Sequence, residues 1–140
     1  MSARFTRLDA AGSRVRKSTA DFAAVSDSQT GLIWLLDDPG SMAWADAKAW
    51  AKKLRALGTR GWRLPTLLEW VNGPVDYTRS NPAVDTTYFR GFANGWYWTS
   101  TVDAESPSDD AWLVDLRFGY VARNFQALHS YVRAVAAGQS

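Results

Sequence analysis

Residues 61–69, GWRLPTLLE, decide the centre of the fold. Pro65 keeps the residue before it out of the helical region. Thr66 then stands three residues before Glu69, which is the spacing of a capping box, in which each residue's side chain binds the other's backbone N–H. We therefore predict a short helix that begins at Thr66 and ends near Asn72-Gly73-Pro74.

A longer helix is predicted before this stretch. Ser41 is its expected N-cap and Gly58 the expected residue beyond its C-cap. We interpret the basic residues near its end, Lys52, Lys53 and Arg55, as a solvated face that suits the helix dipole. The apolar positions that recur at helical spacing are Trp44, Ala47, Trp50, Ala51, Leu54 and Leu57.

Strand-like runs lie at both ends of the chain, at residues 4–8, 22–25, 32–36, 96–101, 111–118, 120–125 and 131–135. Strands at both ends, with two helices and long loops between them, predict an α+β domain. Residues 74–95 form a long irregular stretch. We expect its aromatic residues to hold it in place by packing against the domain: Tyr77, Tyr88, Phe89 and Phe92.

The eight tryptophans suit a compact core or a recognition surface. We assign six of them to the core: Trp34, Trp44, Trp50, Trp62, Trp98 and Trp112. Strand alternation over residues 111–118 predicts one face with Trp112, Val114 and Leu116 and another with Leu113, Asp115 and Arg117. Arg63 is expected to be partly buried, with backbone oxygens, Glu69 or Asp115 as its partners.

At 140 residues the chain fits one domain, and its net charge of +2 is too small to predict nucleic-acid binding. Residues 1–20 are a candidate basic arm, since this segment has one acidic residue, Asp9, and five basic ones: Arg4, Arg7, Arg14, Arg16 and Lys17. The chain has no cysteine, which excludes disulfides, thiol catalysis and cysteine-based zinc sites. We expect no signal peptide and no membrane span, and therefore a cytoplasmic or virion-associated protein.

Six segments, taken together and in order, resemble the Lcl C-terminal (DUF1566) domain family. They are VSDSQTGLIW (25–34), residues 44–54, GWRLPTLLE (61–69), YWTST (97–101), AWLVDL (111–116) and YVRAV (131–135). The resemblance implies one C-type-lectin-like domain over residues 1–140, with two helices packed on small antiparallel sheets and the N- and C-terminal strands close together. Family members usually have serine where Thr99 stands. They often have cysteines where Ala51 and Ala134 stand, so the stability of a bridge must here come from packing.

The residues that could carry chemistry are few, and we expect no enzyme. His129 is the only histidine and has no nucleophile or metal spacing around it, so we interpret it as a surface residue. Formylglycine-generating enzymes share the lectin-like architecture but depend on cysteines. Asp103, Glu105, Asp109 and Asp110 are calcium candidates in an oxygen-rich loop, although the loop lacks an EF-hand pattern, and a solvated acidic loop is the simpler interpretation. No other cofactor is expected.

The C-terminal strands and their loops are the candidate binding region, as they are in lectin-like folds that resemble this one. Rings, cations and amides concentrate there and in the long loop before them: Trp96, Tyr120, Arg123, Asn124, Phe125, Gln126, His129 and Arg90, with Arg79 as an extension. The alternative is that Phe125 belongs to the core and the others are ordinary surface.

The expected function is non-catalytic recognition of a carbohydrate, an anionic polysaccharide or a surface protein, as a phage or bacterial adhesion component. Because weak sites gain from multivalency, we expect a homo-oligomer, a trimer first, or a place in a larger assembly. A structural or decoration subunit of a virion and an intracellular protein-interaction domain are the alternatives.

Overall fold

The computed structural model describes residues 4–16 and 21–138. Neither helix in this part of the chain has the length and hydrophobicity that a bilayer crossing requires. The elements, in chain order, are β1 (Phe5–Leu8), β2 (Ala24–Asp27), β3 (Leu32–Leu35), α1 (Trp44–Lys53), α2 (Leu67–Asn72), β4 (Trp96–Val102), β5 (Asp110–Asp115), β6 (Tyr120–Phe125) and β7 (Val135–Ala137).

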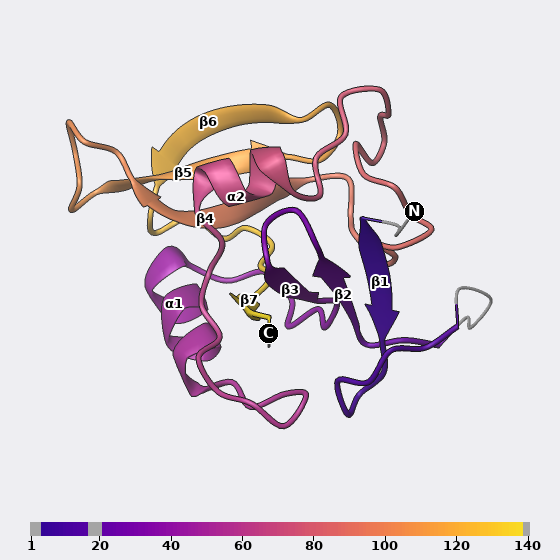
Figure 1. Ribbon diagram of the computed structural model, residues 1–140. Helices are drawn as coiled ribbons and strands as arrows, with labels where there is room; N and C mark the ends of the chain where they lie inside the picture. Colours follow the sequence, from indigo (N-terminus) through magenta and orange to yellow (C-terminus); the bar gives the residue numbers. More distant parts are fainter. Residues whose placement is uncertain (1–3, 17–20, 139–140) are drawn as a thin grey trace.

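The strands form two antiparallel sheets, so the α+β prediction is confirmed (Figure 1). One sheet has the order β1-β2-β3-β7, which places the first and last strands in the same sheet. The other has the order β4-β5-β6, in which β6 is an edge strand. Of the candidate basic arm 1–20, Phe5–Leu8 form β1, while residues 1–3 and 17–20 lie outside the described residues.

Helix α2 begins as the sequence predicts. The Thr66 hydroxyl accepts from Glu69 N–H at 3.1 Å, and a Glu69 carboxylate oxygen accepts from Thr66 N–H at 2.8 Å. The same carboxylate accepts two bonds from Arg63, at 2.7 and 2.8 Å. The Arg63 bonds, helped by the Thr66 N–H, hold the pKa of Glu69 below its usual value. Arg63 thus pairs with Glu69, although its side chain is half exposed, whereas Asp115 pairs with Arg117.

Helix α1 differs from its prediction at both ends. Its N-cap is Ala43, which has no side-chain cap, so the assignment of Ser41 as the cap is wrong. Leu54 is already extended, so the helix ends at Lys53, five residues before Gly58. Leu57 and Gly58 both have positive φ and form the tight turn of a bridge between Ala56 and Thr59. The spacing of Leu54 and Leu57 predicted a longer helix. In the structure both leucines pack against the core from the turn that follows the helix.

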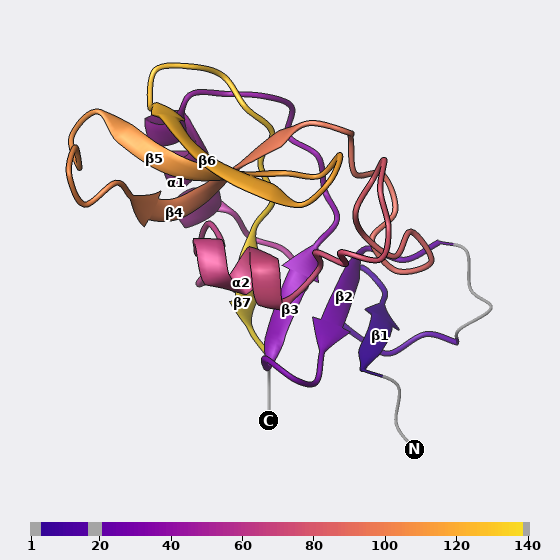
Figure 2. The ribbon, with the colours of Figure 1, turned by 90° about the horizontal axis from the view of Figure 1, so that it is seen from above.

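Helix α2 lies between the two sheets (Figure 2). Its Trp70 ring packs edge-on against Trp34 of β3, with ring centroids 4.8 Å apart, and at a tilt against Tyr97 of β4, with centroids 5.3 Å apart. The Trp70 indole N–H also donates to the Trp98 carbonyl at 3.2 Å. One fully buried tryptophan therefore joins both sheets, and the sequence analysis did not assign it to the core.

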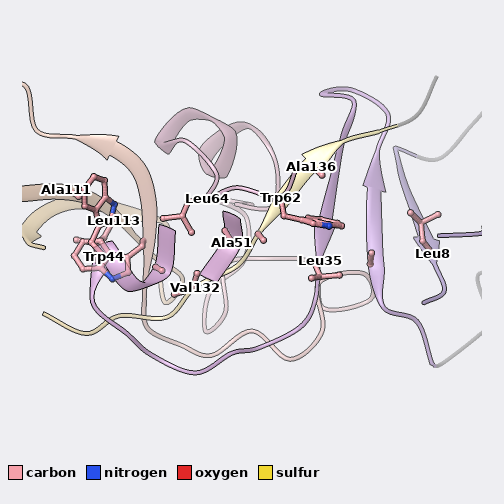
Figure 3. Packing of buried hydrophobic residues seen from close by; sticks show 14 residues of the cluster. Leu8, Leu35, Trp44, Ala51, Trp62, Leu64, Ala111, Leu113, Val132 and Ala136 are labelled. Carbon is pink, nitrogen blue, oxygen red and sulfur yellow. The ribbon is translucent and has the colours of Figure 1, made fainter. Parts of the chain in front are cut away.

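Successive residues of the central strands alternate between two core clusters. Leu113 belongs to the cluster that contains α1 residues Trp44, Ala47 and Ala51, and Val114 belongs to the cluster around Trp70. Figure 3 shows the first cluster running from Trp44 and Leu113 past Ala51 and Val132 to Trp62 and Leu35. Ala51 and Ala134, where the family often has cysteines, are both buried in this cluster.

Several predicted burial states and strand bounds differ in the structure. Trp50 and Trp112 are half-buried rather than core residues, whereas Trp34, Trp44, Trp62 and Trp98 are buried as predicted. The predicted strand 111–118 ends at Asp115, and the predicted strand 131–135 begins only at Val135. Of the expected pins, Phe89 and Phe92 are buried, but Tyr77 is exposed and reaches the Gly119 carbonyl through its hydroxyl at 2.9 Å.

A fully buried cation in the YVRAV segment escaped the sequence analysis. Arg133 donates to the carbonyls of Val132 and Gly91, at 2.9 and 3.0 Å, and its guanidinium lies 4.4 Å from the Phe92 ring centroid. Asp38 is 3.5 Å away and half exposed. Through these contacts with Gly91 and Phe92, the buried guanidinium links the irregular stretch before β4 to the segment that leads into β7.

Candidate functional site

Strand β6 and the segment after it form the most open part of the C-terminal region. Five of the six β6 residues are exposed, Ala122 being the half-buried exception. The alternative that Phe125 belongs to the core is wrong, because this side chain is 63% exposed. The exposure follows from topology, since within residues 4–16 and 21–138 β6 pairs with β5 alone and neither helix makes an extensive contact with it.

Four of the predicted binding residues line one hollow of about 240 Å³. Trp96 comes from the start of β4, Arg123 and Asn124 from β6, and His129 from the loop after β6. The rest of the lining consists of Leu113, Ala122, Leu128 and Ser130. Residues that are distant in sequence therefore surround one small space.

The register of the sheet explains this convergence. Leu113 lies opposite Ala122, and Trp98 lies opposite Leu113. Because side chains of one strand alternate between faces, Trp96 shares the face of Trp98. The chain then folds back after Phe125, whose carbonyl accepts from Leu128 N–H at 3.1 Å. This turn brings residues 128–130 over the face that carries Trp96 and Ala122.

A second hollow, of about 310 Å³, adjoins the first. It is lined by Ser41, Gly95, Trp96, His129, Ser130 and Tyr131, and so shares Trp96, His129 and Ser130 with its neighbour. Ser130 and Met42 exchange two backbone hydrogen bonds, at 3.0 and 3.1 Å. These bonds hold Ser130, which lines both hollows, in place. The two hollows form a short groove with Trp96 and His129 at its centre. We call these residues and hollows the β6 groove.

The β6 groove offers mainly hydrogen-bonding groups beside a ring. Arg123 lies opposite Trp112, so its side chain is on the other face of the sheet from Ala122, where it is 3.6 Å from the buried carboxylate of Asp103. The Asn124 side-chain oxygen accepts from Phe125 N–H at 2.8 Å, so its amide group remains available to donate. His129 is exposed. Such a set suits hydroxyl or amide groups of a ligand.

The other predicted binding residues lie elsewhere. Phe125 and Gln126 line a separate hollow with Asp109 and Asp110, and Gln126 donates to the carbonyls of Pro107 and Asp110. Tyr120 stands at the β5–β6 turn, with its ring 5.6 Å from that of Phe118.

Arg90 contacts Phe22 and is not among the residues that line the β6 groove. It donates to the Phe22 carbonyl and stacks on the Phe22 ring at 4.7 Å. Arg79 is held by Asp76 at 3.1 Å and Asp85 at 3.7 Å. The two arginines therefore stabilise the long loop, and the structure does not bring them to the β6 groove.

The calcium candidates do not converge. In residues 4–16 and 21–138 no three histidine, aspartate or glutamate side chains form a group that could hold a metal ion. Asp103 instead accepts from Glu105 N–H at 3.1 Å and faces Arg123. Glu105 and Asp109 are exposed.

Sequence reasoning missed the apolar half of the lining. Leu113, Ala122 and Leu128 look like ordinary strand or loop residues, and only the β5–β6 register reveals that the first two face the same space. Ser130, next to His129, could have been included on adjacency alone. A hollow of about 340 Å³ on the four-stranded sheet is less suited to a ligand, since its lining has no aromatic ring and Arg14 is its only charged residue.

Residues 23–136 match the family model of the Lcl C-terminal domain. The match includes both helices, β2 to β6 and most of β7. Among curated proteins, none matches the chain.

Proposed function

Because the chain belongs to the Lcl C-terminal domain family, we propose that it is a non-catalytic binding module whose β6 groove recognises a carbohydrate. One observation carries the proposal: Trp96, Arg123, Asn124 and His129, from three separate segments, line one hollow. Sugars are bound in proteins by a ring that packs on their apolar face and by planar polar groups that bond their hydroxyls. The groove combines both kinds of group.

The size of the groove favours a small group at the end or the edge of a glycan. Ligand pockets for whole drug-sized molecules span about 300–1,000 Å³, and each of the two hollows lies at or near the lower end. A single sugar residue fits such a space better than an extended chain does. Affinity per site is then modest, and multivalency would strengthen attachment.

The charge of the groove favours a neutral or singly charged sugar over a polyanion. Arg123 is the only lysine or arginine in the lining, and Asp103 already balances it. A polyanionic chain needs several unpaired cations along its path. We therefore expect neutral hydroxyl-rich glycans to bind at least as well as sulfated ones.

A glycan array tests the proposal. The wild-type chain should bind a defined set of glycans, and Asn124→Ala and His129→Ala should lose that set, because both residues line the hollow and Asn124 shares the face of Ala122. Arg60→Ala is the matched control, because Arg60 is exposed and lies outside the β6 groove. EDTA should leave binding unchanged. Equal binding by all three variants would refute the site.

A second candidate function is that of a structural subunit in an assembly. Its support is the concentration of exposed apolar side chains on and around β6: Phe118, Tyr120, Val121, Phe125 and Leu128. Exposed apolar residues that cluster in this way mark protein interfaces. If no glycan binds and the chain assembles through this surface, the second function is favoured.

A further inference from the structure

The outer edge of β6 carries backbone groups that nothing in the described chain pairs. Two bonds fix their direction: Gln126 N–H donates to the Asp109 carbonyl at 2.8 Å, and Leu116 N–H donates to the Gly95 carbonyl at 2.9 Å. In an antiparallel sheet the bonded pairs alternate along the strand. Tyr120, Ala122 and Asn124 therefore direct their backbone groups toward β5, and Val121, Arg123 and Phe125 direct theirs outward.

Only two of these three outward-facing residues remain open. Phe125 N–H donates to the Asn124 side chain at 2.8 Å, and the Phe125 carbonyl accepts from Leu128 N–H at 3.1 Å. Val121 and Arg123 have no corresponding bond among the residues that the structure describes. Two N–H and two C=O groups, at the spacing of a strand, thus have no partner within residues 4–16 and 21–138.

The other edge of this sheet is closed. Along β4, Trp98 N–H donates to the Tyr131 carbonyl at 3.0 Å, and Tyr131 N–H donates to the Trp96 carbonyl at 2.9 Å. Ser100 N–H is bound by the Pro65 carbonyl at 2.8 Å. The open β6 edge is a template for another strand, because proteins usually cover or interrupt such edges.

We propose that a second copy of this chain pairs with β6, antiparallel, about a two-fold axis at Ala122. In this register Val121 of each copy lies opposite Arg123 of the other copy. Each of these pairs exchanges two hydrogen bonds. Every open backbone group on both edges is then used.

The other two symmetric registers are poorer. A register centred on Arg123 places two like charges opposite each other, which destabilises a sheet, and places Val121 opposite Phe125, whose backbone groups are already bound. A register centred on Val121 places Arg123 opposite Gly119. That residue lies outside the strand, and its carbonyl accepts from the Tyr77 hydroxyl.

The side chains and charges fit the Ala122 register. Two small alanine side chains meet at the axis, Tyr120 lies beside Asn124 of the other copy, and the Arg123 stem lies beside Val121. Arg123 is the only charged residue of β6, and its own Asp103 lies 3.6 Å away. Bringing two copies together therefore adds no unbalanced charge, and it covers part of the exposed Tyr120 and Val121 side chains.

The resulting dimer has a six-stranded sheet with both β6 grooves on one face, since Trp96, Leu113 and Ala122 share a face of their sheet. It is a two-fold dimer, whereas the sequence analysis expected a trimer. The pairing does not depend on what the groove binds.

Sedimentation velocity over a concentration series is the first test. The wild-type chain should show a monomer–dimer equilibrium. Val121→Pro removes an outward N–H without touching the bonds to β5, which is where an edge strand accepts proline, and it should weaken the dimer by at least about tenfold, because two bonds and their strand contact are lost. Val121→Thr keeps the backbone and is the matched control, which should dimerise like wild type. A wild-type chain that stays monomeric, or a Val121→Pro chain that dimerises normally, overturns the proposal.

Cross-linking decides the case if Val121→Pro unfolds. Non-bonded residues that lie opposite each other in an antiparallel pair are about 4.5 Å apart at Cα, within disulfide range. The chain has no cysteine of its own, so Ala122→Cys should give a covalent dimer under mild oxidation. Arg117→Cys, an exposed position outside β6, should give far less. Equal yields from the two variants overturn the register.

Discussion

At the scale of single residues, the buried carboxylate of Asp27 shows how the N-terminal sheet is held. Asp27 accepts from two Arg4 nitrogens, at 2.9 and 2.8 Å, and from Gln29 N–H at 3.0 Å. Burial by itself raises the pKa of Asp27. The bonds from Arg4 and Gln29, with the charge of Arg4, outweigh burial and lower this pKa below its ordinary 3.8. The carboxylate therefore stabilises β1 on β2 only while it is ionised.

Asp27→Asn should reduce the free energy of unfolding at pH 7 by about 2 kcal/mol, because charge-assisted hydrogen bonds are replaced by weaker ones. The stabilisation by Asp27 is fully present above pH 3.8 and is lost as the pH falls through the lower folded-state pKa. The difference between wild type and variant should shrink correspondingly in acid. Urea unfolding between about pH 7 and pH 3 measures it, with exposed Glu105→Gln as the control. A difference that stays constant with pH would contradict this role.

Single residues also mark the limit of prediction from sequence. Arg63 and Glu69 could be paired because they lie six residues apart in a recognisable motif. Arg133 could not be placed in the core, since its partners, Gly91 and the Phe92 ring, come from an irregular stretch about forty residues earlier. Sequence patterns reveal local partners, and a buried cation with distant carbonyl partners leaves no such pattern.

At the scale of elements, helix ends were predictable where the side chains themselves form the cap. The α2 start follows from Thr66 and Glu69, whose reciprocal bonds need no distant partner. The α1 start does not follow from Ser41, because Ala43 begins that helix without a side-chain cap. Tertiary packing of Trp44, whose indole N–H donates to the Thr99 carbonyl at 2.9 Å, positions α1 instead.

Thr66→Ala should cost about 1 kcal/mol of stability, the usual loss for an N-cap hydroxyl. Ser41→Ala should change the free energy of unfolding by less than about 0.5 kcal/mol, the range of ordinary surface substitutions. Chemical denaturation of the two variants side by side makes the comparison. Equal losses would show that Ser41 has a capping role that the structure does not give it.

The candidate site was partly predictable at this scale too. Its polar members could be chosen from sequence because rings, cations and amides concentrate near the end of the chain. Their grouping could not, since Tyr120 and Phe125 are neighbours of Arg123 in sequence but lie outside the β6 groove. The hollow arises from the β5–β6 register and from the turn at Leu128.

At the scale of the whole molecule, the two core clusters share their strands, so neither can form alone. Leu113 and Val114 of β5, and Ala134 and Val135 near β7, are adjacent residues that belong to different clusters. Unfolding should therefore be one cooperative transition. Tryptophan fluorescence and far-UV circular dichroism should give coincident denaturation curves. Two separated transitions would contradict the prediction of a single domain over residues 1–140.

The central claim is that this rigid frame presents the β6 groove as its binding site. The most direct test is an amide NMR titration of the chain with the strongest glycan from the array. The account predicts shifts centred on Trp96, Arg123, Asn124 and His129, with Arg90 and its Phe22 contact unaffected. Shifts centred on the four-stranded sheet or on the Arg90 loop, or no shifts at saturating glycan, would contradict it.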